Sequence, residues 1–149
     1  MHNAFSLVAR GFHQKKHVTV RRWRMIAGVG LDLCEIARMQ KVCDSEAFCS
    51  RVFTDGEREY AASRASRSES LAGMFAAKEA FAKATGLGLS RTGLKNVEVI
   101  HDKSGRPSLV LNPNAAFYDS LRNARFHLSL SHDGGVAAAV VIYESEAER

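Results

Sequence analysis

The 149-residue chain has no apolar run that approaches the ~20 residues a helix needs to cross a bilayer. Its longest apolar stretch, 136–143, has the length of a strand. Cysteine is scarce as well: Cys34, Cys43 and Cys49 form no CxxC pair, and no pair of histidines lies near them to complete a zinc site. These absences favour a cytoplasmic protein with free thiols over a membrane, disulfide-bonded or zinc-binding one.

Acidic residues are absent from the first 24 positions, which hold six Lys and Arg residues. The remaining positions carry 15 basic against 16 acidic residues, a net charge of −1, although the whole chain is at +5. The excess positive charge therefore belongs to the N-terminal segment. The rest of the chain offers no general electrostatic attraction for nucleic acid, and we expect neither nucleic acid nor membrane as a partner.

Residues 1–24 have three interpretations. They resemble a transit peptide in being basic and free of acid, although they are poor in serine. They are also typical of a basic arm for nucleic acid or an acidic membrane. The third interpretation is a disordered extension, translated from a start upstream of the real one. Because Met25 directly precedes a strand-like segment, we favour the third and expect residues 25–149 to form the domain.

Residues 25–149 contain no repeat, linker or low-complexity segment and suffice for one hydrophobic core. A capping box at Thr54 and Glu57 predicts a helix start, and Gly86 is typical of a helix end. The periodicities predict helices over 35–43, 54–63, 66–85 (capped by Ser66 or Ser68) and 112–123, and strands over 25–31, 97–101, 108–111, 126–131 and 136–143. Because "HDGG" (132–135) links the last two strands as a hairpin, we expect an α+β domain with a largely antiparallel sheet packed against the long helix.

The long helix places Lys78 near the middle of its apolar stripe, where an ammonium is costly unless it is paired or extends past the core. Glu79 and Lys83 lie one turn apart on the flank, beside small residues at 72 and 76 that we expect to leave open space. A helix-stabilising pair worth about 0.2–0.5 kcal/mol would also explain Glu79 and Lys83. The pattern favours a helix that directs charge at a ligand.

Asp32 ends the first predicted strand between small residues, which is typical of a Mg²⁺ ligand and also of a turn or cap aspartate. Together with Glu79 it favours a site for metal and phosphate. His132, in the predicted turn, is better placed to reach a ligand than His127, which a strand would hold in hydrogen-bonded structure. "GLGLS" (86–90) follows a helix rather than preceding one, so we interpret Gly86 as a C-cap.

Four segments taken together resemble the 4'-phosphopantetheinyl transferases: "GVGLDL" (28–33), "FAAKEAFAKATGLG" (75–88), "GRP" (105–107) and "HLSLSH" (127–132). Length and order are similar to the holo-(acyl-carrier-protein) synthase branch, over essentially all of 25–149. The resemblance implies an enzyme that moves 4'-phosphopantetheine from coenzyme A to a serine hydroxyl of an apo acyl carrier protein. Adenosine 3',5'-bisphosphate would be released, with Mg²⁺ as cofactor.

The resemblance also implies roles for single residues. Asp32 and Glu79 would hold Mg²⁺ against the coenzyme A diphosphate, and Lys83 would contact the phosphate being transferred. His132 would lie beside the coenzyme, with Lys78 and Gly86 as further contacts. Glu79 or a metal-bound water would accept the serine proton.

The carrier protein is acidic, and the resemblance implies that basic helices just after "GxD" dock it, with solvated helix charges as the alternative. The branch also implies a homotrimer with sites between subunits. One departure is Met74, where many relatives carry an arginine that contacts a coenzyme phosphate. A non-catalytic module with a degenerate site is therefore the rival interpretation. The candidate docking residues are Arg38, Lys41, Phe48 and Arg51, with Met39 as a further apolar contact.

Overall fold

The computed structural model describes residues 23–147, which form an α+β fold with two antiparallel sheets. The helices are α1 (Ile36–Val42), α2 (Glu46–Val52), α3 (Asp55–Ala62), α4 (Arg67–Thr85), α5 (Leu89–Thr92), the short 3-10 helix η1 (Leu94–Asn96) and α6 (Tyr118–Leu121). The strands are β1 (Trp23–Glu35), β2 (Val97–His101), β3 (Pro107–Leu111), β4 (Arg125–Asp133) and β5 (Val136–Ala147). Within residues 23–147, no helix is long and apolar enough to span a membrane.

The larger sheet brings the two ends of the described chain together. Its strand order is β1-β5-β4, all antiparallel, and Asp32 of β1 lies opposite Ala139 of β5. Strands β4 and β5 are joined at Gly134 and Gly135, whose φ angles of 56° and 83° suit the tight turn of a hairpin. The smaller sheet pairs β2 with β3, and β3 packs beside β4 of the larger sheet. The predicted antiparallel pairing is confirmed, in two sheets.

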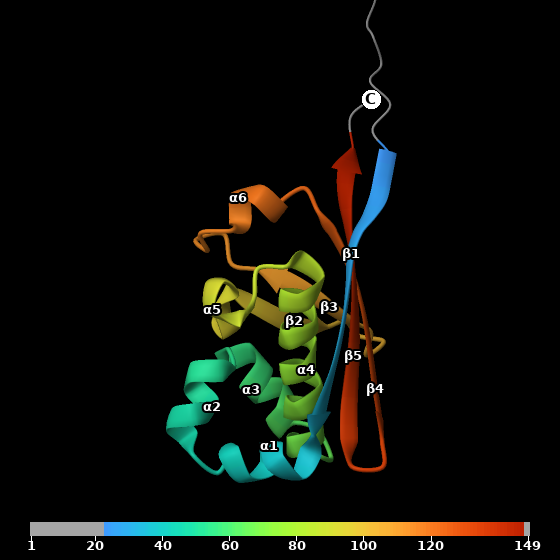
Figure 1. Cartoon of the computed structure of the whole chain (residues 1–149). Coiled ribbons are helices and arrows are strands. Elements are labelled where there is room, and N and C mark those ends of the chain that lie inside the picture. The colour runs from blue at the N-terminus through green and yellow to red at the C-terminus, as the bar shows by residue number, and fades with distance from the viewer. Residues whose placement is uncertain (1–22, 148–149) are drawn as a thin grey trace, which may run out of the picture.

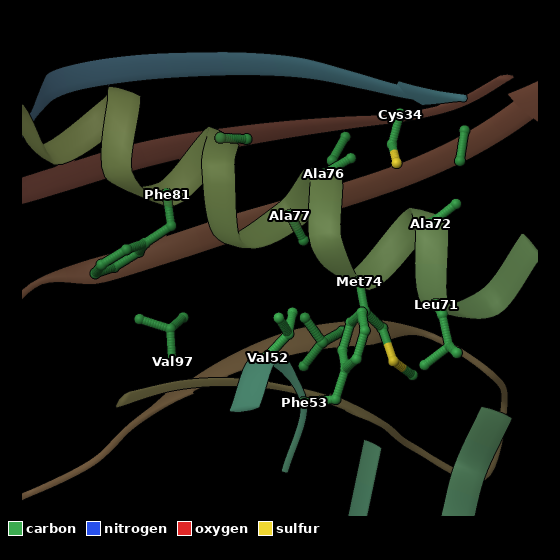
Figure 2. Packing of buried hydrophobic residues seen from close by; sticks show 14 of the residues in the cluster. Cys34, Val52, Phe53, Leu71, Ala72, Met74, Ala76, Ala77, Phe81 and Val97 are labelled. Carbon is green, nitrogen blue, oxygen red and sulfur yellow. The ribbon is translucent and has the colours of Figure 1, made fainter. Parts of the chain in front are cut away.

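Helix α4 is the centre of the molecule, between the larger sheet and the layer of β2, β3 and the shorter helices (Figure 1). Because elements pack on both sides of it, most of its residues are buried. Ala72 and Ala76 are fully buried on the side toward the strands, whereas Met74 points toward Phe53 on the other side (Figure 2). The expected open space beside Ala72 and Ala76 is therefore wrong, since the small side chains let the strands approach α4.

Local sequence signals explain where the helices begin and end. The hydroxyl of Thr54 accepts from the Glu57 backbone N–H, and the Glu57 carboxylate accepts from the Thr54 N–H, which completes the predicted capping box of α3. Ser66, one of the two predicted caps, accepts from the Glu69 N–H and starts α4. Gly86 ends α4 with a φ of 70°, as predicted. These ends fix the length of the helix that carries the candidate site.

Three predicted boundaries need correction. Strand β1 begins at Trp23, and Arg24 forms a salt bridge with Glu146 at 3.0 Å. Trp23 and Arg24 therefore belong to the sheet rather than to the predicted extension. The rest of the predicted extension lies outside the described residues. The helix expected over 112–123 is only α6, because the Asn112 side chain accepts from the Asn114 N–H and holds 113–117 in turns. His132 lies within β4, not in the turn that follows.

Candidate active site

The candidate site depends on an unusually close contact between β1 and α4. A Cβ atom added at Gly30 would lie 1.9 Å from the backbone oxygen of Ala80, and one at Gly28 would lie 1.9 Å from that of Ala84. Only glycine fits at both positions, so the backbone of β1 lies directly on the helix. The next residues of β1 are therefore held against the last turns of α4.

This contact brings the predicted metal ligands and the predicted phosphate ligand together. Lys83 Nζ lies 2.6 Å from Asp32 Oδ1 and donates to the Leu31 carbonyl at 3.0 Å. Glu79, one turn earlier on the same flank of α4, is half-buried and close enough to feel the charges of Asp32 and Lys83. Two carboxylates and one ammonium thus form a cluster at the β1–α4 contact, which we call the acidic pair with Lys83.

The electrostatics of the cluster favour binding of a cation. Burial raises the pKa of Glu79, and the negative charge of Asp32 raises it further, against the opposing charges of Lys83 and Arg38. The hydrogen bond to Asp32 raises the pKa of Lys83. A cation beside both carboxylates would offset the repulsion that Asp32 exerts on the charge of Glu79. Within residues 23–147, however, no group of three or more His, Cys, Asp or Glu is arranged to hold a metal ion by itself.

Lys78 does not belong to this cluster. Its Nζ lies 2.7 Å from Glu57 Oε2 and donates to the carbonyls of Val52 at 3.2 Å and Leu94 at 2.7 Å. Its side chain is 1% exposed, and burial lowers its pKa while Glu57 opposes the shift. All three ammonium protons have protein acceptors, so the predicted contact of Lys78 with coenzyme A finds no support here. The lysine in the apolar stripe is a buried ion-pair partner.

His132 lies on the opposite flank of α4 from Asp32. In the sheet, Ala137 of β5 lies between Cys34 of β1 and His132 of β4. Strand β5 therefore separates His132 from the strand that carries Asp32. His132 Nε2 lies 3.3 Å from Glu69 Oε1, near the start of α4. It lines an open pocket with polar and aromatic groups from several elements. That lining includes Tyr60, Arg64, Glu69, His101, Pro107 and Leu130.

The side chains of this pocket include one stacked aromatic pair. The rings of Tyr60 and His101 lie 4.0 Å apart and are nearly parallel, with the Arg64 guanidinium 5.5 Å from the Tyr60 ring centre. Burial lowers the pKa of His101, as does the charge of Arg64. Sequence reasoning missed this group because α3 and β2 come together only in the folded chain. Gly105 and Pro107 of the "GRP" motif, whose proline begins β3, line the same pocket.

The predicted docking residues lie on α1 and α2. Arg38, Lys41 and Arg51 are exposed, and Phe48 is half-buried against the core. Arg38 also lies close enough to Glu79 to lower the pKa of that carboxyl. Gly86 lies at the far end of α4, where its N–H donates to the Lys83 carbonyl at 3.2 Å.

Comparison with known proteins decides which family this arrangement represents. The family model of the 4'-phosphopantetheinyl transferase superfamily matches residues 28–141. This range contains the acidic pair with Lys83 and His132. The chain belongs to this superfamily.

Relatives of the superfamily match almost over their whole length. A holo-(acyl-carrier-protein) synthase of Treponema denticola is 44% identical over 124 residues, covering 80% of this chain and 99% of that protein. One from Clostridium perfringens is 37% identical over 128 residues, covering 82% and 96%. The enzyme class and branch that the sequence motifs predicted are confirmed.

Solved structures of the superfamily confirm the predicted fold class. The synthase of Neisseria meningitidis has a TM-score of 0.74 at 30% identity, covering 81% of this chain and all of that one. The synthase of Bacillus anthracis, solved in complex with CoA (3',5'-ADP), has a TM-score of 0.69 at 35% identity, covering 81% and 98%.

Met74 was the one residue that suggested a degenerate transferase site. It is 1% exposed and packs in the core beside Phe53 (Figure 2). This position does not face either the acidic pair with Lys83 or the pocket that His132 lines. Its departure from the family pattern therefore gives no support to a non-catalytic module.

Proposed function

We propose that the protein transfers 4'-phosphopantetheine from coenzyme A to a serine hydroxyl of an apo acyl carrier protein and releases adenosine 3',5'-bisphosphate. One observation carries the proposal: two carboxylates and an ammonium gather where β1 lies directly on α4. They lie within the matched residues 28–141. Transfer of a phosphoryl-type group needs this combination of charges around phosphate oxygens.

Asp32 and Glu79 fit a Mg²⁺ ion as part of its ligand set. Mg²⁺ takes one or two carboxylates from a protein and fills its other positions with phosphate oxygens and water. The ion would neutralise charge on the diphosphate of the coenzyme. Lys83, whose side chain is half-exposed beside Asp32, supplies a second positive charge for the phosphate being transferred. Removal of the Lys83 side chain should leave the binding of the metal ion intact and weaken the binding of the phosphate.

The pocket that His132 lines fits the nucleotide end of the coenzyme. Its stacked pair of Tyr60 and His101 offers an aromatic surface for a base, and Arg64 offers charge for a phosphate. Such a combination of a flat apolar surface and one cation is what a phosphorylated adenosine needs. His132 then contacts the coenzyme from β4.

The two halves of this site lie on opposite flanks of α4, which supports a site shared between copies of the chain. The sheet face that points away from α4 carries Val29, Leu31 and Leu33 of β1, which are 60%, 55% and 62% exposed. Val29 is paired with Ile142 and Leu31 with Val140, so the apolar face continues onto β5. A contiguous exposed apolar face of this kind marks a protein interface. We assign it to the contact between subunits of a homotrimer.

The acyl carrier protein docks on α1 and α2 in this proposal. Arg38, Lys41 and Arg51 offer positive charge to an acidic partner, and Phe48 offers an apolar contact. Charges at such a surface mainly raise the rate of encounter, so docking should weaken as salt rises. The surface adjoins the cluster at β1, because α1 follows Asp32 by four residues.

The experiment is an intact mass spectrum of apo acyl carrier protein incubated with this protein, coenzyme A and Mg²⁺, with an EDTA control. We expect a metal-dependent gain of one phosphopantetheine. Glu79→Gln should slow the gain on the order of a hundredfold or more while leaving the fold intact. Glu59→Gln, at an exposed position of α3, is the matched control and should retain full activity. No gain with folded protein and several carriers would reject the transferase.

A further inference from the structure

Two of the three cysteines are in contact in the core. Cys43 is the C-cap of α1 and Cys49 lies in α2, and their Sγ atoms are 3.3 Å apart. The two residues are 4% and 0% exposed. Cys43 Sγ also lies 3.5 Å from Met39 Sδ, so three sulfur atoms gather between α1 and α2. Cys34, in β1, takes no part in this contact.

An arginine at the start of α4 approaches the pair from the other side. Arg67 Nη2 donates to Cys49 Sγ at 3.4 Å, and Arg67 Nη1 donates to the Cys43 carbonyl at 3.5 Å. Arg67 thus contacts the sulfur of Cys49 but only the backbone carbonyl of Cys43. Burial raises the pKa of Cys43 to about 12, and the neighbouring Cys49 contributes to the shift. The two thiols are thus in unequal surroundings, as in a nucleophile and its resolving partner.

Solvent has a route to the pair. An open pocket between the end of α1 and the start of α4 is lined by Gln40, Cys43, Asp44 and Arg67. It is polar and reaches the residues that touch both sulfur atoms. Cys49 does not line this pocket, but Cys43 and Arg67, which do, both contact the Cys49 sulfur, so a small polar oxidant in the pocket lies one side chain away from it.

We propose that Cys43 and Cys49 are a redox-active pair that a hydroperoxide converts into a reversible disulfide. The Cys49 thiol gives up its proton and attacks one peroxide oxygen, the O–O bond breaks, and Cys49 becomes a sulfenic acid while the released oxygen takes up that proton and leaves as water or alcohol. The Cys43 sulfur then attacks Cys49, the S–O bond breaks, and hydroxide leaves with the Cys43 proton as water. Two thiols are oxidised by two electrons and one peroxide is reduced. A thiol reductant restores both cysteines.

The disulfide would alter the docking surface, a consequence that rests on the proposed function. Lys41 lies two residues before Cys43, Phe48 directly precedes Cys49, and Arg51 follows it by two. An S–S bond of about 2.05 Å must draw the two sulfurs together from contact distance. This shifts α1 against α2 and changes the spacing of the docking residues. Oxidation should therefore weaken use of the carrier protein more than use of coenzyme A.

The first test is a peptide map of the full-length protein after mild treatment with hydrogen peroxide, alkylation under denaturing conditions and digestion with trypsin. Cleavage places both cysteines in one peptide, residues 42–51, and Cys34 in another, residues 25–38. We expect peptide 42–51 to be two hydrogens lighter and unalkylated, with peptide 25–38 alkylated as before. Treatment with a thiol reductant before alkylation should reverse the change.

Variants sharpen this test. Cys49→Ser and Cys43→Ser should each lose the internal disulfide, whereas Cys34→Ser should retain it. The wild-type map decides the matter if a variant does not fold. Two alkylated cysteines in peptide 42–51 after peroxide treatment, a sulfinic acid there without a disulfide, or a disulfide that includes Cys34 would each overturn the proposal.

The second readout is kinetic. Oxidised protein should show a carrier-protein KM raised by roughly tenfold, the effect of displacing one or two interface contacts, with the KM for coenzyme A unchanged. Cys49→Ser should not respond to peroxide. Equal effects on both substrates would reject the link to docking while the disulfide stands. Loss of transfer in the reduced protein would count against the proposed function alone, since the peptide map does not depend on activity.

Discussion

Lys78 and Glu57 form an ion pair inside the protein, with 2.7 Å between Nζ and Oε2 and side chains that are 1% and 0% exposed. The second carboxylate oxygen of Glu57 accepts from the Val99 N–H at 2.8 Å, so the pair connects α3, α4 and β2. Removing Lys78 leaves a buried carboxylate without its counter-charge. Lys78→Met should therefore lower the free energy of unfolding by about 3–5 kcal/mol, measured by urea denaturation.

The ion pair of half-exposed Lys83 with Asp32 provides the control for this loss. Lys83→Met should change the free energy of unfolding far less than Lys78→Met does, because solvent screens the charge of Lys83. The double variant Lys78→Met with Glu57→Gln should recover part of the stability that Lys78→Met loses, since no unpaired charge stays buried. Equal losses in Lys78→Met and Lys83→Met would contradict a structural role for Lys78.

The close contact between β1 and α4 predicts an effect of a single methyl group. Gly30→Ala would place a Cβ 1.9 Å from the Ala80 oxygen, so β1 must move away from the helix. We expect a loss of about 1–3 kcal/mol in unfolding free energy and a loss of transfer activity as Asp32 leaves Lys83. In Gly73→Ala the new Cβ would meet Leu130 Cδ1 at an ordinary 3.8 Å. That variant should be unchanged or up to about 1 kcal/mol more stable.

The apolar sheet face predicts a change of oligomeric state. Val29 is 60% exposed in the single chain, and a lysine there would place a charge in the proposed interface. Val29→Lys should shift the protein to a smaller species in sedimentation or light scattering. Val110→Lys, on β3 at 43% exposure, makes the same chemical change outside that face and should not. A trimer that survives Val29→Lys would refute the assigned interface.

Arg51 gives a cleaner test of docking than Arg38, because Arg38 also acts on the charge of Glu79. Arg51 is exposed on α2, and its Nε donates to the carbonyl of Ala47 in the same helix at 3.2 Å. Arg51→Glu should raise the carrier-protein KM roughly three- to tenfold at low salt and leave the KM for coenzyme A unchanged. Arg122→Glu, on the far side at α6, is the matched control. Equal effects of both variants would reject α2 as the docking surface.

His101 predicts a dependence of stability on pH. Burial holds its folded pKa below the ordinary value of 6.5, so the unfolded chain takes up a proton first as pH falls. The unfolding free energy therefore decreases as pH falls from 6.5 to the lowered pKa of the folded state. His101→Phe preserves a ring against Tyr60 and should show a flatter profile in urea denaturation between about pH 5 and about pH 8. Parallel profiles for the two proteins would show that His101 does not contribute.

Local signals in the sequence were sufficient for the helix ends. The capping box at Thr54 and the glycine after Thr85 depend on residues within one turn of each other, and both are observed. The partner of Lys78 was not predictable in this way, since Glu57 lies 21 positions away on another helix. Burial of Lys78 was visible in the periodicity, but its partner follows from the packing of three elements.

The candidate site, too, was predictable from the sequence only in part. Asp32 and Glu79 were expected to act together, and the glycines of "GVGLDL" explain why β1 can lie on α4. The separation of His132 from Asp32 was not visible, because it depends on β5 lying between β1 and β4. The helix predicted over 112–123 did not form over its first residues, because the Asn112 side chain accepts a hydrogen bond from the Asn114 backbone N–H.

The strand order has a consequence for the timing of synthesis. Asp32 of β1 lies opposite Ala139 of β5, which follows it by more than a hundred residues in the sequence. A ribosome must therefore release the residues through β5 before β1 can pair with it. Pairing over so long a separation is slow compared with helix formation. The newly made chain should thus possess its helices, α4 and Glu79 included, well before Asp32 arrives beside them.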